Sequence, residues 1–229
     1  GVQAAAVSAA SVIFTAKAIP VVLPYLKSPD PKVKRRVLEC LLHYGDAASR
    51  KSALIHFERM VTNATPEGEQ SRIEAARLIG EVYDPTFSSH LARLIRADLS
   101  SQVICEAMAA AATGKYPEVI RDIICRLSGT VTKSQARNAL VQFGDVAVEP
   151  LRETLSDANV SRDLRINIPR TLSKIPSQAA MDALLNALRL EDRFIRYKVI
   201  LGLEEMARRF PTLRVNREMI EGAIISDAM

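Results

Sequence analysis

The chain has 229 residues, of which 48% are hydrophobic and 5% aromatic, so it can bury a sizeable core in one large or two small domains. A charged fraction of 25% is usual for globular proteins and excludes bulk disorder. The absence of Trp and the low Gly count of nine are typical of helices rather than many-stranded sheets. The net charge of +5 is spread over both halves of the chain, so it permits weak attraction to polyanions without requiring it.

The first 26 residues are apolar enough to suggest a signal sequence or a membrane span. Lys17 interrupts this stretch, and Pro20 and Pro24 break it, so no run of about 18 uninterrupted apolar residues remains. The sequence therefore predicts that this segment does not span a membrane.

Beyond this stretch, apolar residues recur at three- and four-residue spacing in blocks of about 11 to 18 residues. No segment alternates as a strand would, so the sequence predicts an all-α fold. We expect Pro20 and Pro150 in the first turns of helices, Thr65 as an N-cap, and Pro169 to kink its helix. Short polar or Pro- and Gly-containing stretches separate the blocks, at 28–31, 63–69, 83–85, 115–117, 128–130, 156–159 and 175–177.

The helical blocks are similar to one another, which indicates an internal repeat. The equivalent positions are Leu41, Ile79, Leu140, Leu172 and Leu203. The steps between them are 38, 61, 32 and 31 residues, and a weaker copy at 103–117 fills the double step. The spacing predicts about six copies of a helix pair.

The segments that join successive pairs share a pattern, which reads LKSPDPKVK at 26–34, LSDANVSRDLR at 155–165 and LRLEDRFIR at 188–196. This pattern resembles the HEAT-repeat family. The resemblance implies a right-handed α-solenoid of about six antiparallel helix pairs, forming a single domain over 1–229. It also implies a ladder of Asp-to-Arg pairs between repeats. Because Ser28 and Leu190 stand where the turn Asp is expected, leaving Asp157 there, we expect this ladder to be incomplete.

Residues 147–225 are similar to bacterial proteins in which HEAT repeats follow a nucleotide-translocase-like membrane domain and often precede a cyclic-nucleotide-binding domain. This resemblance implies a cytoplasmic module, tethered to the inner membrane through a domain outside this segment. The chain starts at Gly1 without an initiator Met and stops at Met229 inside an amphipathic pattern, so we expect a piece of a longer protein.

Residues that could carry chemistry are few. Three histidines lack metal-ligand spacing, and no Gly-rich phosphate loop or nucleophile motif occurs. The three cysteines, Cys40, Cys105 and Cys125, have apolar neighbours, and we expect buried, reduced thiols. The sequence predicts no catalytic residue, no metal and no cofactor.

The basic residues are the most informative exposed groups. If the repeats stack in register, the starts of the first helices form a basic edge that could track an acidic partner or a phosphate backbone. The competing interpretation is that they are inter-repeat and solvated residues. The candidate binding residues are Lys32, Lys34, Arg35, Arg36, Arg162, Arg165, Arg193, Arg196 and Lys198.

From these observations the sequence predicts a protein that is not an enzyme. We expect a non-catalytic interaction or regulatory scaffold within a transporter-like or signalling protein, whose partner is another protein or neighbouring domains of the same chain. The alternative is a nucleic-acid-binding protein of the HEAT-like DNA glycosylase type. The scarcity of aromatic residues for base stacking weakens that alternative.

Overall fold

The computed structural model describes residues 2–215 and residue 220, and every regular element in that part of the chain is a helix. The predicted all-α fold is therefore confirmed. Contacts divide the chain into two compact units, Gly1–Tyr116 (unit 1) and Pro117–Met229 (unit 2), which are described separately. The expected single domain over 1–229 stays a prediction, and the amphipathic pattern expected near Met229 lies outside the described residues apart from Ile220.

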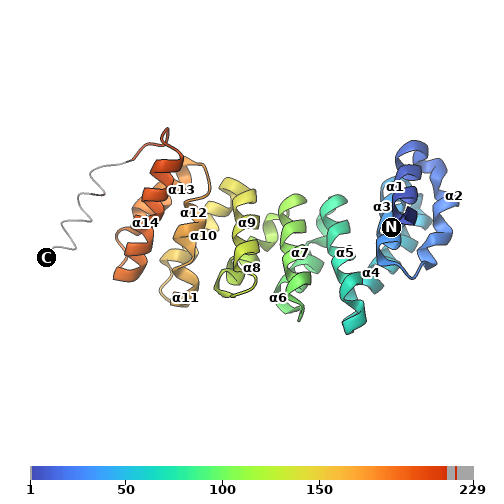
Figure 1. The fold of residues 1–229 in the computed structure, drawn as a ribbon, viewed down its shortest axis with the longest axis horizontal. Helices are drawn as coiled ribbons and strands as arrows, with labels where there is room; N and C mark the ends of the chain where they lie inside the picture. Colours follow the sequence, from blue (N-terminus) through green and yellow to red (C-terminus); the bar gives the residue numbers. More distant parts are fainter. Residues whose placement is uncertain (1, 216–219, 221–229) are drawn as a thin grey trace. The chain divides into compact units, whose positions relative to one another are not determined.

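Unit 1 contains seven of the described α-helices, joined by short 3₁₀ turns (Figure 1). They are α1 (Val2–Phe14), α2 (Ile19–Val22), α3 (Pro31–Tyr44), α4 (Ala47–Thr62), α5 (Glu69–Glu81), α6 (Ser88–Ala97) and α7 (Ser101–Thr113).

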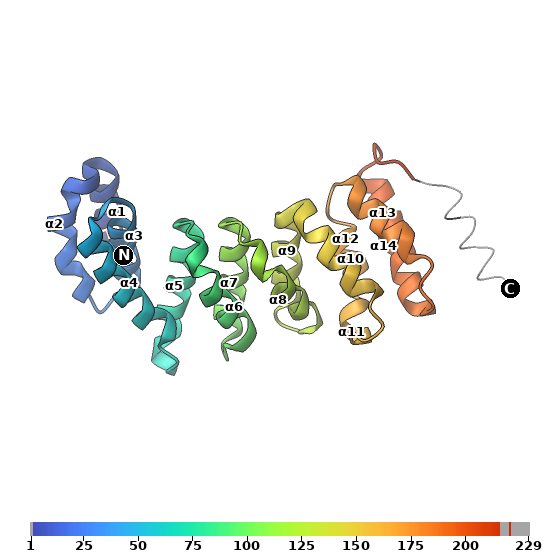
Figure 2. The same cartoon turned by 180° about the vertical axis from the view of Figure 1, so that it is seen from behind.

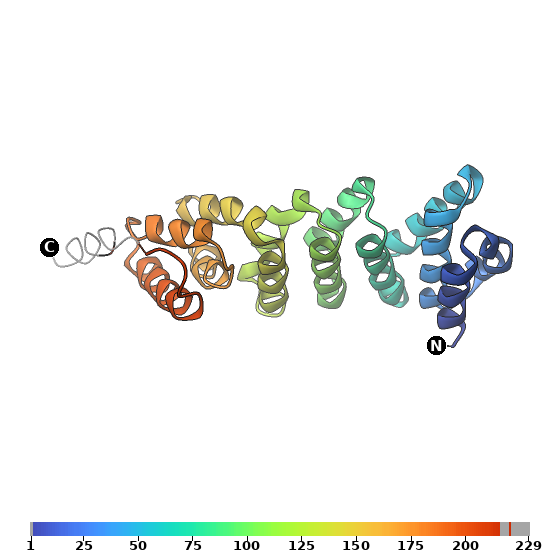
Figure 3. The same cartoon turned by 90° about the horizontal axis from the view of Figure 1, so that it is seen from above.

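The helices of unit 1 fall into two rows, as the view from above shows (Figure 3). One row contains α1, α3, α5 and α7 and is called the front row. In it α1 packs on α3, α3 on α5 and α5 on α7. In the back row α4 packs against α3 and α5, and α6 packs against α7. The apolar stripes of both rows meet in a core that includes Phe57, Ile73 and Leu91, each no more than 1% exposed.

Local sequence explains where these helices begin and end. Asp30, Asp46 and Ser100 are N-caps whose side chains accept hydrogen bonds from backbone N–H groups of the first turn of α3, α4 and α7. Thr65 caps the 3₁₀ turn before α5, as predicted. Gly80 permits the closest approach of α5 and α7, because an added Cβ would lie 3.0 Å from the Cα of Ala110.

Unit 2 contains seven more of the described helices, all in the part of the chain drawn from yellow-green to red in Figure 2. They are α8 (Ile120–Cys125), α9 (Lys133–Phe143), α10 (Val148–Ser156), α11 (Arg162–Arg165), α12 (Ile168–Leu172), α13 (Gln178–Ala187) and α14 (Arg193–Arg209).

Unit 2 repeats the two-row arrangement. In its front row α9 packs on α12 and α12 on α14, and in its back row α10 packs on α13. Pro169 lies in the first turn of α12, so in place of the predicted kink the chain breaks between two short helices, α11 and α12. Gly144 ends α9 with φ of 64°, a left-handed conformation that other residues rarely adopt.

The N-terminal apolar segment is incompletely covered. By length and composition the run Val2–Lys27 is apolar enough to cross a membrane, and most of it is exposed. A core helix of a soluble protein and a signal sequence satisfy the same criterion. The expectation that this segment does not span a membrane therefore stays a prediction.

The cysteines differ from the expectation that all three are buried. Cys40 is buried on α3, Cys105 is half-buried on α7, and Cys125 is exposed at the end of α8. The prediction is wrong for Cys125, because its apolar neighbours in the sequence point into the core while its own side chain lies on the outer side of the helix.

Candidate functional site

Four of the predicted basic residues lie on α3 in unit 1. Asp30 caps this helix, with its Oδ1 accepting a hydrogen bond of 2.9 Å from the Lys32 backbone N–H, and Pro31 occupies the first turn. The side chains of Lys32, Lys34, Arg35 and Arg36 therefore project from the first two turns, as the sequence suggested.

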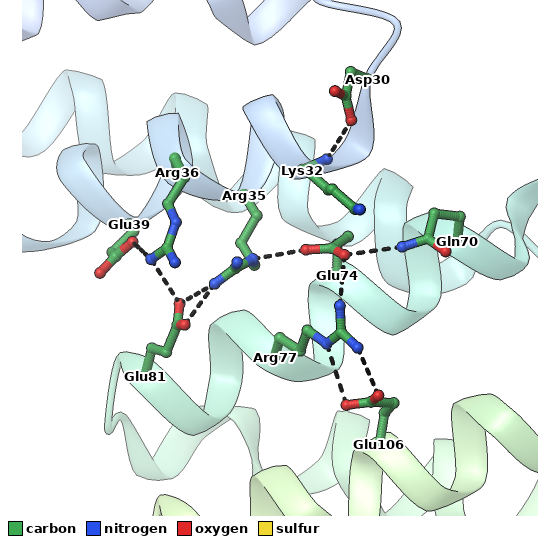
Figure 4. Close-up of polar contacts among 10 residues, drawn as sticks. All are labelled: Asp30, Lys32, Arg35, Arg36, Glu39, Gln70, Glu74, Arg77, Glu81 and Glu106. Atoms are coloured by element: carbon green, nitrogen blue, oxygen red, sulfur yellow. Dashed lines mark hydrogen bonds and ion pairs between the residues drawn. The ribbon is translucent and has the colours of Figure 1, made fainter. Parts of the chain in front are cut away.

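Two of these four cations already have partners in the chain (Figure 4). The Arg35 Nε lies 2.7 Å from Glu74 Oε2, and its Nη1 lies 2.5 Å from Glu81 Oε1. Arg36 pairs with Glu39 of its own helix at 2.7 Å, and its Nη1 lies 3.5 Å from Glu81 Oε2 on α5. These arginines join α3 to α5, so the interpretation of the basic residues as contacts between neighbouring helix pairs fits them best.

Glu74 is the centre of this network. Its side chain is fully buried and accepts hydrogen bonds from Arg35, from Arg77 at 2.9 Å and from Gln70 at 2.9 Å. Arg77 reaches onward to Glu106 on α7 at 2.6 Å, and this hydrogen bond raises the pKa of Arg77. Figure 4 shows the resulting chain of charges across α3, α5 and α7.

Beside the network, α1 and α3 line a shallow, open hollow of about 700 Å³. One stripe of α1 forms its floor, and one side of α3 forms its wall. The floor residues are Ala4, Ala5, Ser8, Ala9, Val12 and Ile13, and the wall residues are Lys32, Arg35 and Arg36.

A smaller hollow of about 190 Å³ continues this surface toward the other end of α3. It shares Ser8 and Val12 with the first and adds Glu39, His43 and Tyr44 among its lining residues. The two hollows together follow the length of α1 and are called the α1–α3 groove below.

The surroundings of the groove are apolar and cationic. Val12, Ile13 and Phe14 are 74%, 69% and 56% exposed, which is unusual for three consecutive large apolar residues. Residues 1–62 contain nine basic and four acidic side chains, so this stretch carries a charge equal to the net charge of the whole chain. The net charge is therefore concentrated on α1 to α4, and the comparison of the two halves of the chain did not reveal this.

A third hollow in unit 1, of about 440 Å³, lies between α4, α5, α6 and the loop that follows α6. Its charged residues already have partners: Arg72 pairs with Asp98 at 2.7 Å, and Arg93 donates to the carbonyl of Val61. This hollow therefore offers little free hydrogen-bonding capacity to a ligand.

The predicted basic residues of unit 2 are mostly engaged within their own unit. Arg162 forms a two-pronged pair with Asp192, Arg165 donates to the carbonyl of Leu155, and Arg196 donates to that of Leu190. Lys198 lies over the rings of Phe194 and Tyr197, with its Nζ 5.1 Å and 5.7 Å from their centroids. Arg193 is exposed.

The Asp-to-Arg ladder differs from the expectation based on the turn at Asp157. The pairs that form are Arg72 on α5 with Asp98 before α7, and Arg162 on α11 with Asp192 before α14. Asp192 lies two residues beyond the position at which the sequence pattern placed the turn Asp. Its hydrogen bonds from Arg162 and from the backbone N–H groups of α14 hold its pKa well below the usual range.

Within 2–215 and at 220, no group of three or more His, Cys, Asp or Glu side chains is placed to hold a metal ion.

No protein-family model and no curated protein matches the chain. Among solved structures, the chain is similar to human deoxyhypusine hydroxylase in complex with glycerol, at 15% identity and a TM-score of 0.33. The match covers 84% of this chain and 85% of the hydroxylase chain. A likeness this low assigns neither the hydroxylase's reaction nor its ligands to this chain.

The function predicted from the sequence does not agree with this finding. That prediction was a non-catalytic scaffold in a transporter-like or signalling protein, or alternatively a nucleic-acid-binding protein. The structural neighbour is an enzyme, so the non-catalytic scaffold is not proposed again.

Proposed function

We propose that unit 1 binds a segment of a protein partner in the α1–α3 groove. The segment that fits is an amphipathic helix with an apolar face and acidic residues at its edge. The observation that carries this proposal is the juxtaposition, along one hollow, of an exposed apolar stripe on α1 and the exposed Lys32 of α3. The proposal holds whether or not the chain also catalyses a reaction.

The shape of the groove suits a helix. Ala4, Ala5 and Ala9 form a shallow floor that lets another backbone approach closely, and Val12 and Ile13 give the floor an apolar end. An amphipathic helix laid in such a groove buries its apolar face against residues spaced three and four apart. Burial of Val12 and Ile13 would remove from water apolar surface that is now largely exposed.

The charge of the groove favours an acidic segment. Lys32 is exposed at the rim, and the stretch 1–62 has an excess of basic over acidic residues. Arg35 and Arg36 are held in place by Glu74 and Glu39, so their positions are fixed before a partner arrives.

The same features favour a protein over a membrane surface. A bilayer presents a broad plane, whereas the apolar residues here line a hollow between two helices. A lipid surface remains an outcome that the experiment below detects.

The type of helical repeat and the stacking of the helix pairs are a second part of this proposal. We infer that the helix pairs are HEAT-like repeats and that they continue as a right-handed α-solenoid of about six pairs. The two-row packing within each unit and the Arg72–Asp98 and Arg162–Asp192 pairs support this inference. The resemblance of 147–225 to a HEAT segment and a cytoplasmic location stay proposals.

The test is fluorescence anisotropy with the full chain and two labelled peptides of about 15 residues. Both peptides carry Leu and Ala at the same helical positions, and one has Glu where the other has Lys. We expect the acidic peptide to bind about tenfold more tightly, a difference that two or three exposed charge contacts can supply.

Matched variants locate the binding. Ala9→Glu fills the groove floor and should abolish binding of the acidic peptide, whereas Ala6→Glu, on an exposed part of α1 outside the groove, should retain most of it. Equal loss in both variants would overturn the proposal. So would binding of full-chain protein to phosphatidylglycerol vesicles without binding to either peptide, which would indicate a membrane surface instead.

A further inference from the structure

One face of α14 in unit 2 is apolar and exposed. The helix packs on α12 and α13 through a buried stripe that includes Ile195, Val199 and Met206. A second group of large apolar side chains on the same helix lies outside that stripe. They are Phe194, Tyr197, Ile200 and Leu201, which are 41%, 52%, 48% and 40% exposed. Such a group differs from the single, scattered apolar residues that are usual at a protein surface, and it marks a surface that another molecule covers.

The exposed residues continue as a stripe along α14, called the α14 stripe below. Phe194, Tyr197 and Leu201 are spaced three and four residues apart. Glu204 and Arg208, both exposed, extend the same spacing to the last turn of the helix. Residues with this spacing lie on one face of a helix, and the same spacing forms the seam between two paired helices.

The aromatic end of the α14 stripe is held in place by cations of unit 2. The ring centroids of Phe194 and Tyr197 are 6.3 Å apart, and the Lys198 Nζ lies over both rings. The Arg162 guanidinium lies 5.3 Å from the Phe194 centroid and is itself paired with Asp192. Because these rings are already positioned, docking against them costs less side-chain entropy than docking against mobile side chains.

The charges of α14 complement a second copy of the same helix. Lys198 lies three positions before Leu201, and Glu204 lies three positions after it. When two copies of α14 pair antiparallel about Leu201, Lys198 of each copy lies level with Glu204 of the other. The attraction occurs twice, whereas a parallel pairing would place like charges level with each other.

The two ends of the α14 stripe match in the same arrangement. Phe194 of one copy lies level with Arg208 of the other, since the two positions are equally far from Leu201. A guanidinium over an aromatic ring is the contact that Arg162 already makes with Phe194. A surface that complements itself under a two-fold rotation is what a symmetric dimer requires.

We propose that the α14 stripe binds a second copy of this chain, with the two α14 helices packed antiparallel about Leu201. One pair of helices buries less surface than a standard permanent interface, so the dimer is weak, with a dissociation constant on the order of 10–100 μM. This surface lies in unit 2 and does not depend on the α1–α3 groove proposed for unit 1.

The test is sedimentation equilibrium of the full chain at concentrations from well below to well above that dissociation constant. We expect the average mass to rise with concentration from one chain to two. It should not rise further, because a two-fold interface closes on itself. The mass of a single chain at every concentration, or a mass that grows beyond two chains, would overturn the proposal.

A matched pair of variants locates the interface. Leu201→Glu places two carboxylates at the midpoint of the dimer and should abolish association. Val131→Glu, at an exposed apolar position of unit 2 outside α14, should leave the dissociation constant unchanged. Circular dichroism checks that both variants keep their helix content. Association that survives Leu201→Glu, or is lost equally in both variants, would contradict an interface on α14.

A charge exchange tests the antiparallel arrangement. Lys198→Glu and Glu204→Lys should each weaken association about tenfold or more, because each places like charges level with each other. An equimolar mixture of the two variants should associate as the wild type does, since the mixed dimer again has opposite charges at both places. Damage to the fold of one chain could not be restored by mixing. A mixture no better associated than the separate variants would refute the antiparallel pairing.

Discussion

The guanidinium of Arg72 on α5 lies 2.7 Å from the carboxylate of Asp98, in the loop before α7, and the two side chains are only 8% and 6% exposed. Asp98 also accepts from the backbone N–H of Ser100, the N-cap of α7. One buried ion pair therefore connects a helix of one pair to the start of the next.

Asp98→Asn should lower the free energy of unfolding by about 3 kcal/mol, because it leaves the Arg72 charge buried without its carboxylate. Urea denaturation followed by circular dichroism measures this change. Glu149→Gln is the control, since it breaks the exposed Glu149–Arg152 pair and should have no measurable effect. Equal effects of the two substitutions would contradict a stabilising role for the buried pair.

Glu74→Gln should destabilise unit 1 by about 3 kcal/mol or more. The substitution leaves Arg35 and Arg77 facing a neutral amide at a fully buried position. Glu106→Gln is the matched control on the same network, and its effect should be much smaller because Glu106 is partly exposed. Urea denaturation of both variants is the measurement, and a larger loss for Glu106→Gln would refute this description of the network.

The pH dependence of stability should report Asp192. Its pKa is lowered in the folded protein by Arg162 and by the N–H groups of α14. The contribution of Asp192 to the free energy of unfolding is therefore fully present above the unfolded Asp pKa of about 3.9. It is lost as the pH falls through the lower pKa of the folded protein. Asp192→Asn should therefore show a shallower loss of stability below pH 4 than the wild type. Parallel profiles from denaturation at a series of pH values would count against this contribution.

Gly80→Ala should destabilise the contact between α5 and α7 by about 1–3 kcal/mol, since the new Cβ would lie 3.0 Å from the Ala110 Cα and 3.2 Å from its Cβ. Adding Ala110→Gly removes one of the two contacts. In a double-mutant cycle the second substitution should cost less in the Gly80→Ala background than in the wild type. Strict additivity would show that the two helices do not meet as described.

The sequence predicted the helices well because their signals are local. Apolar spacing identified the all-α fold, and Thr65 and Pro169 marked places at which a helix starts or breaks in the structure. Proline and capping effects act within one turn of helix, so neighbouring residues suffice to read them.

The charge network could not be read in the same way. Arg35 pairs with Glu74 and Glu81, which are 39 and 46 positions away. Pairings of this kind depend on the rotation of each helix about its axis, and apolar spacing defines that rotation too coarsely to select one acidic partner. The predicted basic edge therefore named several residues that the structure uses to join its own helices.

The groove was missed for a related reason. In the sequence the alanines of α1 and the exposed Val12 and Ile13 belong to an apolar stretch that suggests a membrane span or a core helix. Only the packing of α1 on α3 shows which stripe is covered and which remains open beside Lys32.

The most direct test of the proposed function is methyl NMR of the full chain during titration with the acidic amphipathic peptide. Binding in the α1–α3 groove predicts the largest shifts at the methyl groups of Val12 and Ile13, with little change at Val61 and Leu94 in the separate hollow of unit 1. Shifts centred on Val61 and Leu94, or saturating binding that leaves Val12 and Ile13 unchanged, would contradict the proposed groove.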